Sequence, residues 1–165
     1  MGGSDQKNFL AKLVMAFMKI DQKIIFDVII AATSRNKEYF LNKKWPANIK
    51  IHVQPGNYTE LMRRADLAVH AAGSTSWELA YLGVSGICYV LTDNQLPVAK
   101  AVEKERSGIL MGWEKNFSQK KLVQTLESLI NEPKRISSMS RQGTRLIDGK
   151  GARRVAEVLE NEKHN

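Results

Sequence analysis

The sequence predicts an α/β domain built on a doubly wound parallel sheet, and three observations support this. Short apolar runs alternate along the chain with stretches whose apolar residues recur at helical spacing. The short runs are apolar nearly throughout, which is typical of strands covered by helices on both faces. Two glycine-rich turns fall at expected strand ends, where such sheets bind ligands beyond the carboxyl ends of their strands.

The first half of the chain begins with an amphipathic helix. Residues 8–20 carry an apolar stripe at helical spacing, and Asp5 or Ser4 is placed to cap the start of that helix. Residues 26–32 form a β-prone run that only Asp27 interrupts. The elements expected next, in chain order, are a helix at 36–42, a strand at 49–53, a helix at 57–65 and a strand at 65–69.

The second half repeats the same alternation. A helix that contains residues 79–82 should stop at Gly83, and Pro133 marks the end of a later helix. The elements expected after Gly83 are a strand at 87–91, a helix at 97–106, a short strand at 109–111, and helices at 122–130, 136–142 and 151–160. At 165 residues the chain has the length of one domain with a real core, and we expect a single domain over residues 1–165.

The glycine-rich loop Met1-Gly2-Gly3-Ser4-Asp5 directly precedes the first expected helix. A loop of this kind normally follows the first strand of its unit, yet only Met1 stands before it. We therefore expect the sheet to lack its first, central strand, which would leave the backbone groups of the neighbouring strands unpaired. On this interpretation the chain is a fragment, a split gene product or the result of a misplaced start.

The composition excludes several classes of protein. The net charge is +8, but the 25 basic residues are dispersed, which argues against a dedicated nucleic-acid surface. A basic balance suits an anionic small ligand or the headgroup face of a membrane, so we expect no nucleic-acid partner and at most a peripheral membrane contact. No apolar stretch approaches the length of a membrane span and no signal peptide is recognisable, so we expect a cytoplasmic protein. Cys88 is the single cysteine and lies in an apolar run, so it is interpreted as a buried thiol rather than a reactive one.

The segment from His70 to Glu78 has the pattern of an anion-binding turn. An apolar run breaks at Gly73, and a helix restarts with a carboxylate in its first turn. Free backbone N–H groups at such a helix start would face a phosphate.

Four motifs in this order resemble the C-terminal domain of glycosyltransferase family 28. They are Gly2-Gly3-Ser4-Asp5, His70 to Glu78, Thr92-Asp93-Asn94-Gln95, and Asp148-Gly149-Lys150-Gly151-Ala152. Within that family the likeness is nearest to the UDP-sugar hydrolase of the pseudaminic acid pathway and the spore-coat polysaccharide proteins, and it spans nearly the whole chain. The resemblance implies the nucleotide-binding half of a GT-B protein that acts in surface polysaccharide or nonulosonic acid biosynthesis, with a UDP-sugar as substrate and no cofactor.

The resemblance also implies which residues hold the ligand. Gly2, Gly3 and Ser4 would lie near the diphosphate, and the second phosphate loop would comprise Gly73, Ser74, Thr75 and Ser76. Glu78 would accept the ribose hydroxyls, while Asn94 and Gln95 would contact the sugar. The uracil would meet backbone groups around residues 54–56.

Each assignment has a plain structural alternative. Gly2, Gly3 and Ser4 could form a tight turn with a serine cap, and Thr75 with Glu78 fits a capping box. Asp93 and Asn94 could cap the helix before Pro97. Trp77 and Tyr58 are expected to be packing residues rather than partners of the base.

No catalytic group is evident from the sequence. His70 could bind or neutralise a phosphate, but a lone histidine at a strand end is more often structural. No Gly-x-Ser-x-Gly elbow, metal-ligand cluster or Gly-x-Gly-x-x-Gly fingerprint is present. In the hydrolase that this chain resembles, the N-terminal half supplies the base. Whether the isolated chain is an enzyme is therefore open, and the alternative is a non-catalytic binding subunit that needs a separate acceptor-domain chain.

Overall fold

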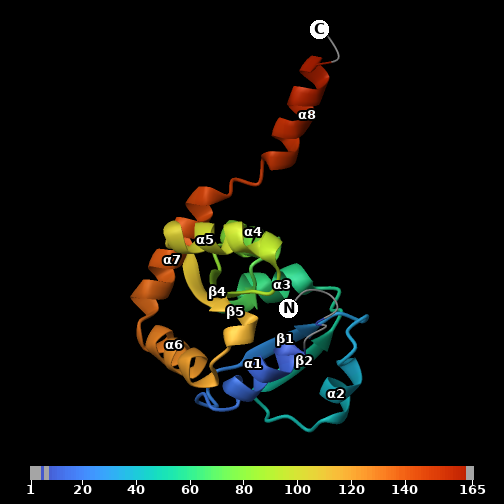
Figure 1. The fold of residues 1–165 in the computed structure, drawn as a ribbon, viewed down its shortest axis with the longest axis vertical. Coiled ribbons are helices and arrows are strands. Elements are labelled where there is room, and N and C mark those ends of the chain that lie inside the picture. Colours follow the sequence, from blue (N-terminus) through green and yellow to red (C-terminus); the bar gives the residue numbers. More distant parts are fainter. Residues whose placement is uncertain (1–4, 6–7, 163–165) are drawn as a thin grey trace.

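The computed structural model describes Asp5 and residues 8–162 (Figure 1). Gly2, Gly3 and Ser4 lie outside these described residues. The helices and strands alternate in the expected order: α1 (Phe9–Phe17), β1 (Phe26–Ile30), α2 (Lys37–Asn42), β2 (Ile49–Val53), α3 (Tyr58–Arg64), β3 (Leu67–Ala71), α4 (Thr75–Leu82), β4 (Ser85–Val90), α5 (Leu96–Lys104), β5 (Gly108–Trp113), α6 (Gln119–Asn131), α7 (Pro133–Leu146) and α8 (Gly151–Glu162). Two short 3-10 helices, η1 (Asp93–Gln95) and η2 (Glu114–Asn116), follow β4 and β5 and were not expected from the sequence.

All strand pairs are parallel, and helices lie on both sides of the strands, so the predicted α/β class is confirmed. Among the described residues the strands form two sheets, with β1 paired to β2 and the order β3-β4-β5 in the other. In Figure 1 the helices α3, α4 and α5 lie on one side of the strands, and α1 and α6 lie on the other. The doubly wound order would place a first strand between β1 and β3, and the described part of the chain contains no strand there.

One large core joins the two sheets through α1. Phe9 packs edge-on against Tyr89 of β4, with the ring centroids 5.0 Å apart. At the other end of the helix, the Phe17 ring stacks on Phe26 of β1, with the centroids 4.5 Å apart. Seven of the nine residues of α1 are buried, so this helix is almost surrounded by the strands and by α6.

The observed ends of the helices and strands are set by the residues in the turns between them. Gly83 ends α4 in the left-handed conformation, with φ of 71°, as its place after the apolar stretch predicts. The strand expected from residue 65 begins at Leu67, because Ala65 is still the C-cap of α3. Pro133 starts α7 as well as following α6, so α7 is longer than the sequence pattern indicates.

The last helix, α8, extends away from the rest of the molecule (Figure 1). Its residues are exposed through position 161. Asp148 anchors its start by accepting hydrogen bonds from the Arg154 guanidinium at 2.7 and 3.2 Å and from the Lys150 N–H at 2.9 Å. These donors lower the pKa of Asp148 to about 2, with the Arg154 hydrogen bond as the main cause. No helix among the described residues is long and apolar enough to cross a membrane.

Candidate nucleotide-binding site

The loops of the candidate site follow the carboxyl ends of parallel strands. Because all paired strands run in the same direction, the segments after β2, β3 and β4 leave from their carboxyl ends. This is the edge at which open α/β sheets bind ligands. The expected phosphate loop and the Asn94–Gln95 pair therefore lie at the carboxyl end of the β3-β4-β5 sheet, and the expected base site lies at the carboxyl end of β2 in the other sheet.

The loop between β3 and α4 presents free backbone donors. The N–H groups of Ser76 and Trp77 donate to the carbonyls of Gly73 and Ser74 at 3.0 and 2.9 Å, which forms the first turn of α4. Within the described part of the chain, the N–H groups of Ser74 and Thr75 have no such acceptor. A helix start with unpaired N–H groups attracts an anion, because the dipole and the donors point the same way.

Gly73 leaves the space above this loop open. A Cβ built at Gly73 would meet no atom within 4 Å, and its φ is not in the positive region. The glycine is therefore required neither by packing nor by backbone conformation. What its missing side chain provides is room for another molecule to approach the loop closely.

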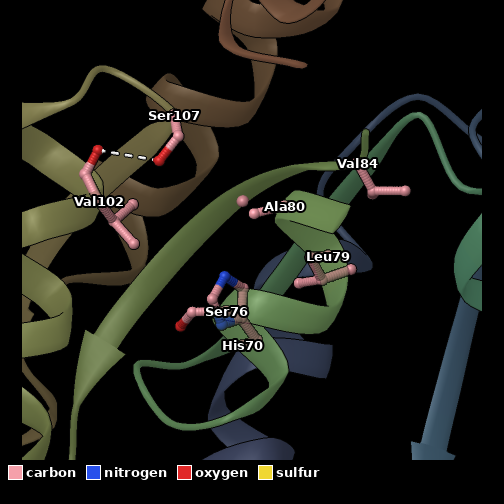
Figure 2. Close-up of a pocket in the computed structure, with 8 residues that line it drawn as sticks. His70, Ser76, Leu79, Ala80, Val84, Val102 and Ser107 are labelled. Carbon is pink, nitrogen blue, oxygen red and sulfur yellow. Dashed lines mark hydrogen bonds between the residues drawn. The ribbon is translucent and has the colours of Figure 1, made fainter. Parts of the chain in front are cut away.

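The Ser76 side chain is buried, which does not fit its predicted role as a phosphate donor. It is only 4% exposed, and its Oγ has no hydrogen-bond partner in the described structure. It lines a small internal cavity together with His70 and Gly86, beneath α4 (Figure 2). Its hydroxyl thus faces the interior, and only Ser74 and Thr75 retain hydroxyl groups at the loop.

His70 is buried and structural in its contacts. Its Nδ1 lies 2.9 Å from the Ala71 carbonyl oxygen, and since a carbonyl can only accept, Nδ1 carries the proton. Burial lowers the pKa of His70 from about 6.5 to about 4, so the ring is neutral at pH 7. A side chain at Gly86 would collide with this ring, which explains the glycine there. The geometry favours the structural interpretation of His70 over a role at a phosphate.

Glu78 is an exposed carboxylate on the first turns of α4, with no ion pair or hydrogen bond in the described structure. The capping box is not formed: the N-cap is Ser74, and no side chain accepts a hydrogen bond there. The prediction for Trp77 as a core residue is wrong, since 36% of its surface is exposed. Both side chains project from the same exposed part of the helix start.

The amides of Asn94 and Gln95 are held by their acceptor oxygens. Gln95 Oε1 accepts from the Leu91 N–H at 2.9 Å, and Asn94 Oδ1 accepts from the Thr92 hydroxyl at 2.6 Å. Each amide NH₂ group is then left as a donor. The alternative role as a cap for α5 is not observed, because η1 intervenes and the N-cap is Gln95, without a side-chain hydrogen bond.

Asp5 caps the first helix, as one of the two predicted candidates. Its carboxylate accepts from the N–H groups of Phe9 at 2.9 Å and Leu10 at 3.2 Å. Asn36 Nδ2 donates to the Asp5 carbonyl at 3.3 Å, which ties this turn to the segment after β1. The loop residues Gly2, Gly3 and Ser4, immediately before this cap, are outside the described residues.

The expected base site after β2 has a strained turn. Gln54 has a φ of 41°, and its N–H donates to the Ile30 carbonyl at 2.8 Å. A Cβ placed on Gly56 would meet no atom within 4 Å. Tyr58 packs against Met62, Leu79 and Val84, in agreement with its prediction as a packing residue.

A cluster of ionisable side chains was missed by the sequence analysis. His52 Nε2 lies 2.7 Å from Asp27 Oδ1, and the Arg64 guanidinium lies 4.0 Å from the other oxygen of Asp27. The parallel register of β1 and β2 brings these residues together, and the polar interruption at Asp27 was the available signal. No group of three or more His, Cys, Asp or Glu residues in the described chain is arranged to hold a metal ion. Cys88 is buried, and burial raises the pKa of its thiol to about 12, as expected for an unreactive cysteine.

Comparison with known proteins gives consistent matches over nearly the whole chain. The profile of the glycosyltransferase family 28 C-terminal domain matches residues 1–159. The spore coat polysaccharide biosynthesis protein SpsG of Bacillus subtilis strain 168 is 24% identical over 167 residues, which cover 98% of this chain and 48% of SpsG. The chain thus spans about half the length of this curated relative.

Solved structures share the fold. The crystal structure of MurG from Acinetobacter baumannii superposes with a TM-score of 0.78 at 18% identity, over 97% of this chain and 48% of MurG. The glycosyltransferase VinC, solved in complex with dTDP, superposes with a TM-score of 0.70 at 18% identity, over 94% of this chain and 38% of VinC.

Proposed function

Since the chain belongs to the glycosyltransferase family 28 C-terminal domain family, we propose that it binds the UDP moiety of a UDP-sugar at the carboxyl edge of its strands. It would serve as the donor-binding half of a GT-B protein in surface polysaccharide biosynthesis. The observation that carries this proposal is the loop at 73–75, where the N–H groups of Ser74 and Thr75 have no backbone acceptor in the described chain and a Cβ at Gly73 would meet no atom within 4 Å. The dTDP complex of VinC supports a nucleoside diphosphate as the ligand class, and the role of SpsG in spore coat polysaccharide biosynthesis supports the pathway class.

The proposed roles follow the chemistry of each group. The N–H groups and hydroxyls of Ser74 and Thr75 donate to the diphosphate, together with Gly2, Gly3 and Ser4. Ser76, which the sequence also assigns to this loop, contributes only through its backbone in the first turn of α4. Glu78 accepts the two ribose hydroxyls, because an exposed carboxylate offers two acceptor oxygens to a diol. Asn94 and Gln95 direct their NH₂ groups to the sugar, and residues 54–56 receive the uracil.

Catalysis is proposed to depend on the half of the relatives that this chain does not span. In the described residues His70 is neutral and buried, and the Asp27–His52 pair lies on a strand face rather than in the loops of the site. The resemblance of Asp93-Asn94-Gln95 to the hydrolase group favours hydrolysis of a UDP-sugar over sugar transfer. Such a hydrolysis could belong to the synthesis of a nonulosonic acid. The alternative function is that of a binding subunit that works after docking to a separate acceptor-domain chain.

The experiment measures thermal stability of the chain with millimolar UDP, UMP and NAD. UDP at about 100 times its Kd should stabilise the protein by about 2.7 kcal/mol, while NAD should have little effect. Gly73→Ala should leave the free protein as stable as before but reduce the UDP effect, because the added methyl occupies the approach to the loop. Gly151→Ala, which also adds a Cβ in open space, is the matched control. Equal stabilisation by UDP and NAD would refute the proposal.

Glu78→Gln tests the ribose contact. Loss of a charged hydrogen-bond acceptor should weaken UDP binding about 10- to 100-fold, while binding of 2′,3′-dideoxy-UDP should barely change. Isothermal titration calorimetry with both nucleotides gives the comparison, and Glu127→Gln on α6 is an exposed control. If Glu78→Gln weakened the binding of both nucleotides equally, Glu78 would act by stabilising the start of α4 rather than by binding the ribose.

A further inference from the structure

The narrow exposed strip of α1 carries methionines and lysines only. Apart from buried residues, α1 and the turn after it present Lys12, Met15, Met18 and Lys19, which are one to two helical turns apart on one side. Met15 is 41% exposed and Met18 is 40% exposed. These two long side chains leave apolar surface in solvent between the lysines.

The segment that includes α2 continues this strip. The Lys43 ammonium lies 3.7 Å from Met15 Sδ, donates to the Tyr39 hydroxyl at 3.2 Å and sits 4.6 Å from the centre of the Trp45 ring. Tyr39 is itself 41% exposed. These contacts join the two segments into one surface, the lysine–methionine face. Its members are Lys12, Met15, Met18, Lys19, Tyr39, Lys43, Lys44 and Trp45.

The lysines of this face lack acidic partners. Among the described residues, none of Lys12, Lys19, Lys43 and Lys44 forms an ion pair with a carboxylate. The acidic residues nearest in sequence are engaged locally: Glu38 lies 3.7 Å from Lys37, and Asp21 accepts the Lys23 N–H at 2.9 Å. The positive charge of the face is therefore available to an outside anion.

We propose that the lysine–methionine face docks onto a membrane surface that contains anionic lipids. The methionine side chains and Tyr39 can enter the boundary between headgroups and acyl chains, where an aromatic ring with a polar end is favoured. Lysine stems lie along the apolar surface while their ammonium groups reach the lipid phosphates.

The composition of the face favours a lipid surface over a protein partner. Protein interfaces are depleted in lysine, whereas basic residues around exposed apolar side chains are typical of surfaces that lie on anionic membranes. The face lies on α1, on the turn after it and around the end of α2, and none of its residues belongs to the proposed nucleotide site, so docking can be tested separately from nucleotide binding.

The test is flotation of the protein with vesicles of phosphatidylcholine alone or with 30% phosphatidylglycerol. The chain should float with the anionic vesicles, and less so as salt rises, because the lipid charge is screened. Lys43→Gln with Lys44→Gln should lower the partition coefficient roughly ten- to thirty-fold. Met15→Ser with Met18→Ser should reduce binding at every salt concentration.

Two double variants serve as matched controls on exposed positions elsewhere. Lys100→Gln with Lys104→Gln on α5 makes the same change of charge, and Val155→Ser with Leu159→Ser on α8 removes the same kind of apolar surface. Each should bind vesicles within about twofold of the parent protein. The proposal is overturned if the parent protein does not float with anionic vesicles, if the controls lose as much binding as the test variants, or if single-stranded RNA is retained instead and is lost with Lys43→Gln and Lys44→Gln.

An unchanged urea midpoint of the Lys43→Gln/Lys44→Gln variant would show that it is folded. Stabilisation by UDP is measured separately from vesicle binding, so failure of one proposal leaves the other standing.

Discussion

His70 illustrates how a single buried side chain couples stability to pH. Its pKa is about 4 in the folded protein because burial disfavours the imidazolium, whereas in the unfolded chain it returns to about 6.5. Between these values the unfolded chain binds a proton that the folded chain does not. The stability that neutral His70 provides is thus complete above pH 6.5 and is lost as the pH falls towards 4.

Urea denaturation between pH 7 and pH 4 measures this contribution. The free energy of unfolding should fall by up to about 1.4 kcal/mol per pH unit within that window as a result of His70. His70→Gln can still donate to the Ala71 carbonyl but does not titrate, so its slope should be shallower by that amount. Equal slopes in the parent and His70→Gln would contradict the assignment.

At the level of elements, Gly108 determines how closely β4 and β5 approach. A Cβ at Gly108 would lie 2.5 Å from the Gly86 carbonyl oxygen and 2.8 Å from Val102 Cγ1. The oxygen belongs to the paired backbone of β4, so relief requires the strands to separate. α5, which packs on both strands, would have to move with them.

Gly108→Ala should therefore destabilise the protein by about 1–3 kcal/mol, the usual cost of overpacking. Gly151→Ala, where nothing lies within 4 Å of the added Cβ, should change stability by less than about 0.5 kcal/mol. Urea midpoints of the two variants give the comparison. A Gly108→Ala protein as stable as Gly151→Ala would show that β4 and β5 can separate at little cost.

Helices and strands could be predicted from the sequence because the spacing of apolar residues and the positions of the turn residues indicate the same elements along this chain. The Gly83 stop and the Asp5 cap depend on local chemistry and are confirmed. The inward orientation of Ser76 and the exposure of Trp77 were not predictable, because they depend on which side of α4 faces β4. The same holds for the Asp27–His52 contact, which forms only when two strands pair in register.

For the molecule as a whole, α1 should make the two sheets one cooperative unit. Phe9→Ala removes a contact with β4, and Phe17→Ala removes a contact with β1. Each should cost about 3–5 kcal/mol. If unfolding is cooperative, either variant should lower the hydrogen-exchange protection of β1 and β4 by the same amount. Loss of protection restricted to the strand that each ring touches would show that the sheets unfold separately.

The bridging position of α1 also has a consequence for the order of assembly. As the chain emerges from a ribosome, α1 can first meet β1 and β2, while Tyr89 is synthesised much later. Until then the face of α1 that receives Tyr89 stays uncovered, so the emerging chain exposes apolar surface for a long part of its synthesis. The slow step of folding should accordingly be the arrival of β4 and α6 on a helix already in place, since their contacts with α1 close the longest loops that end on this helix.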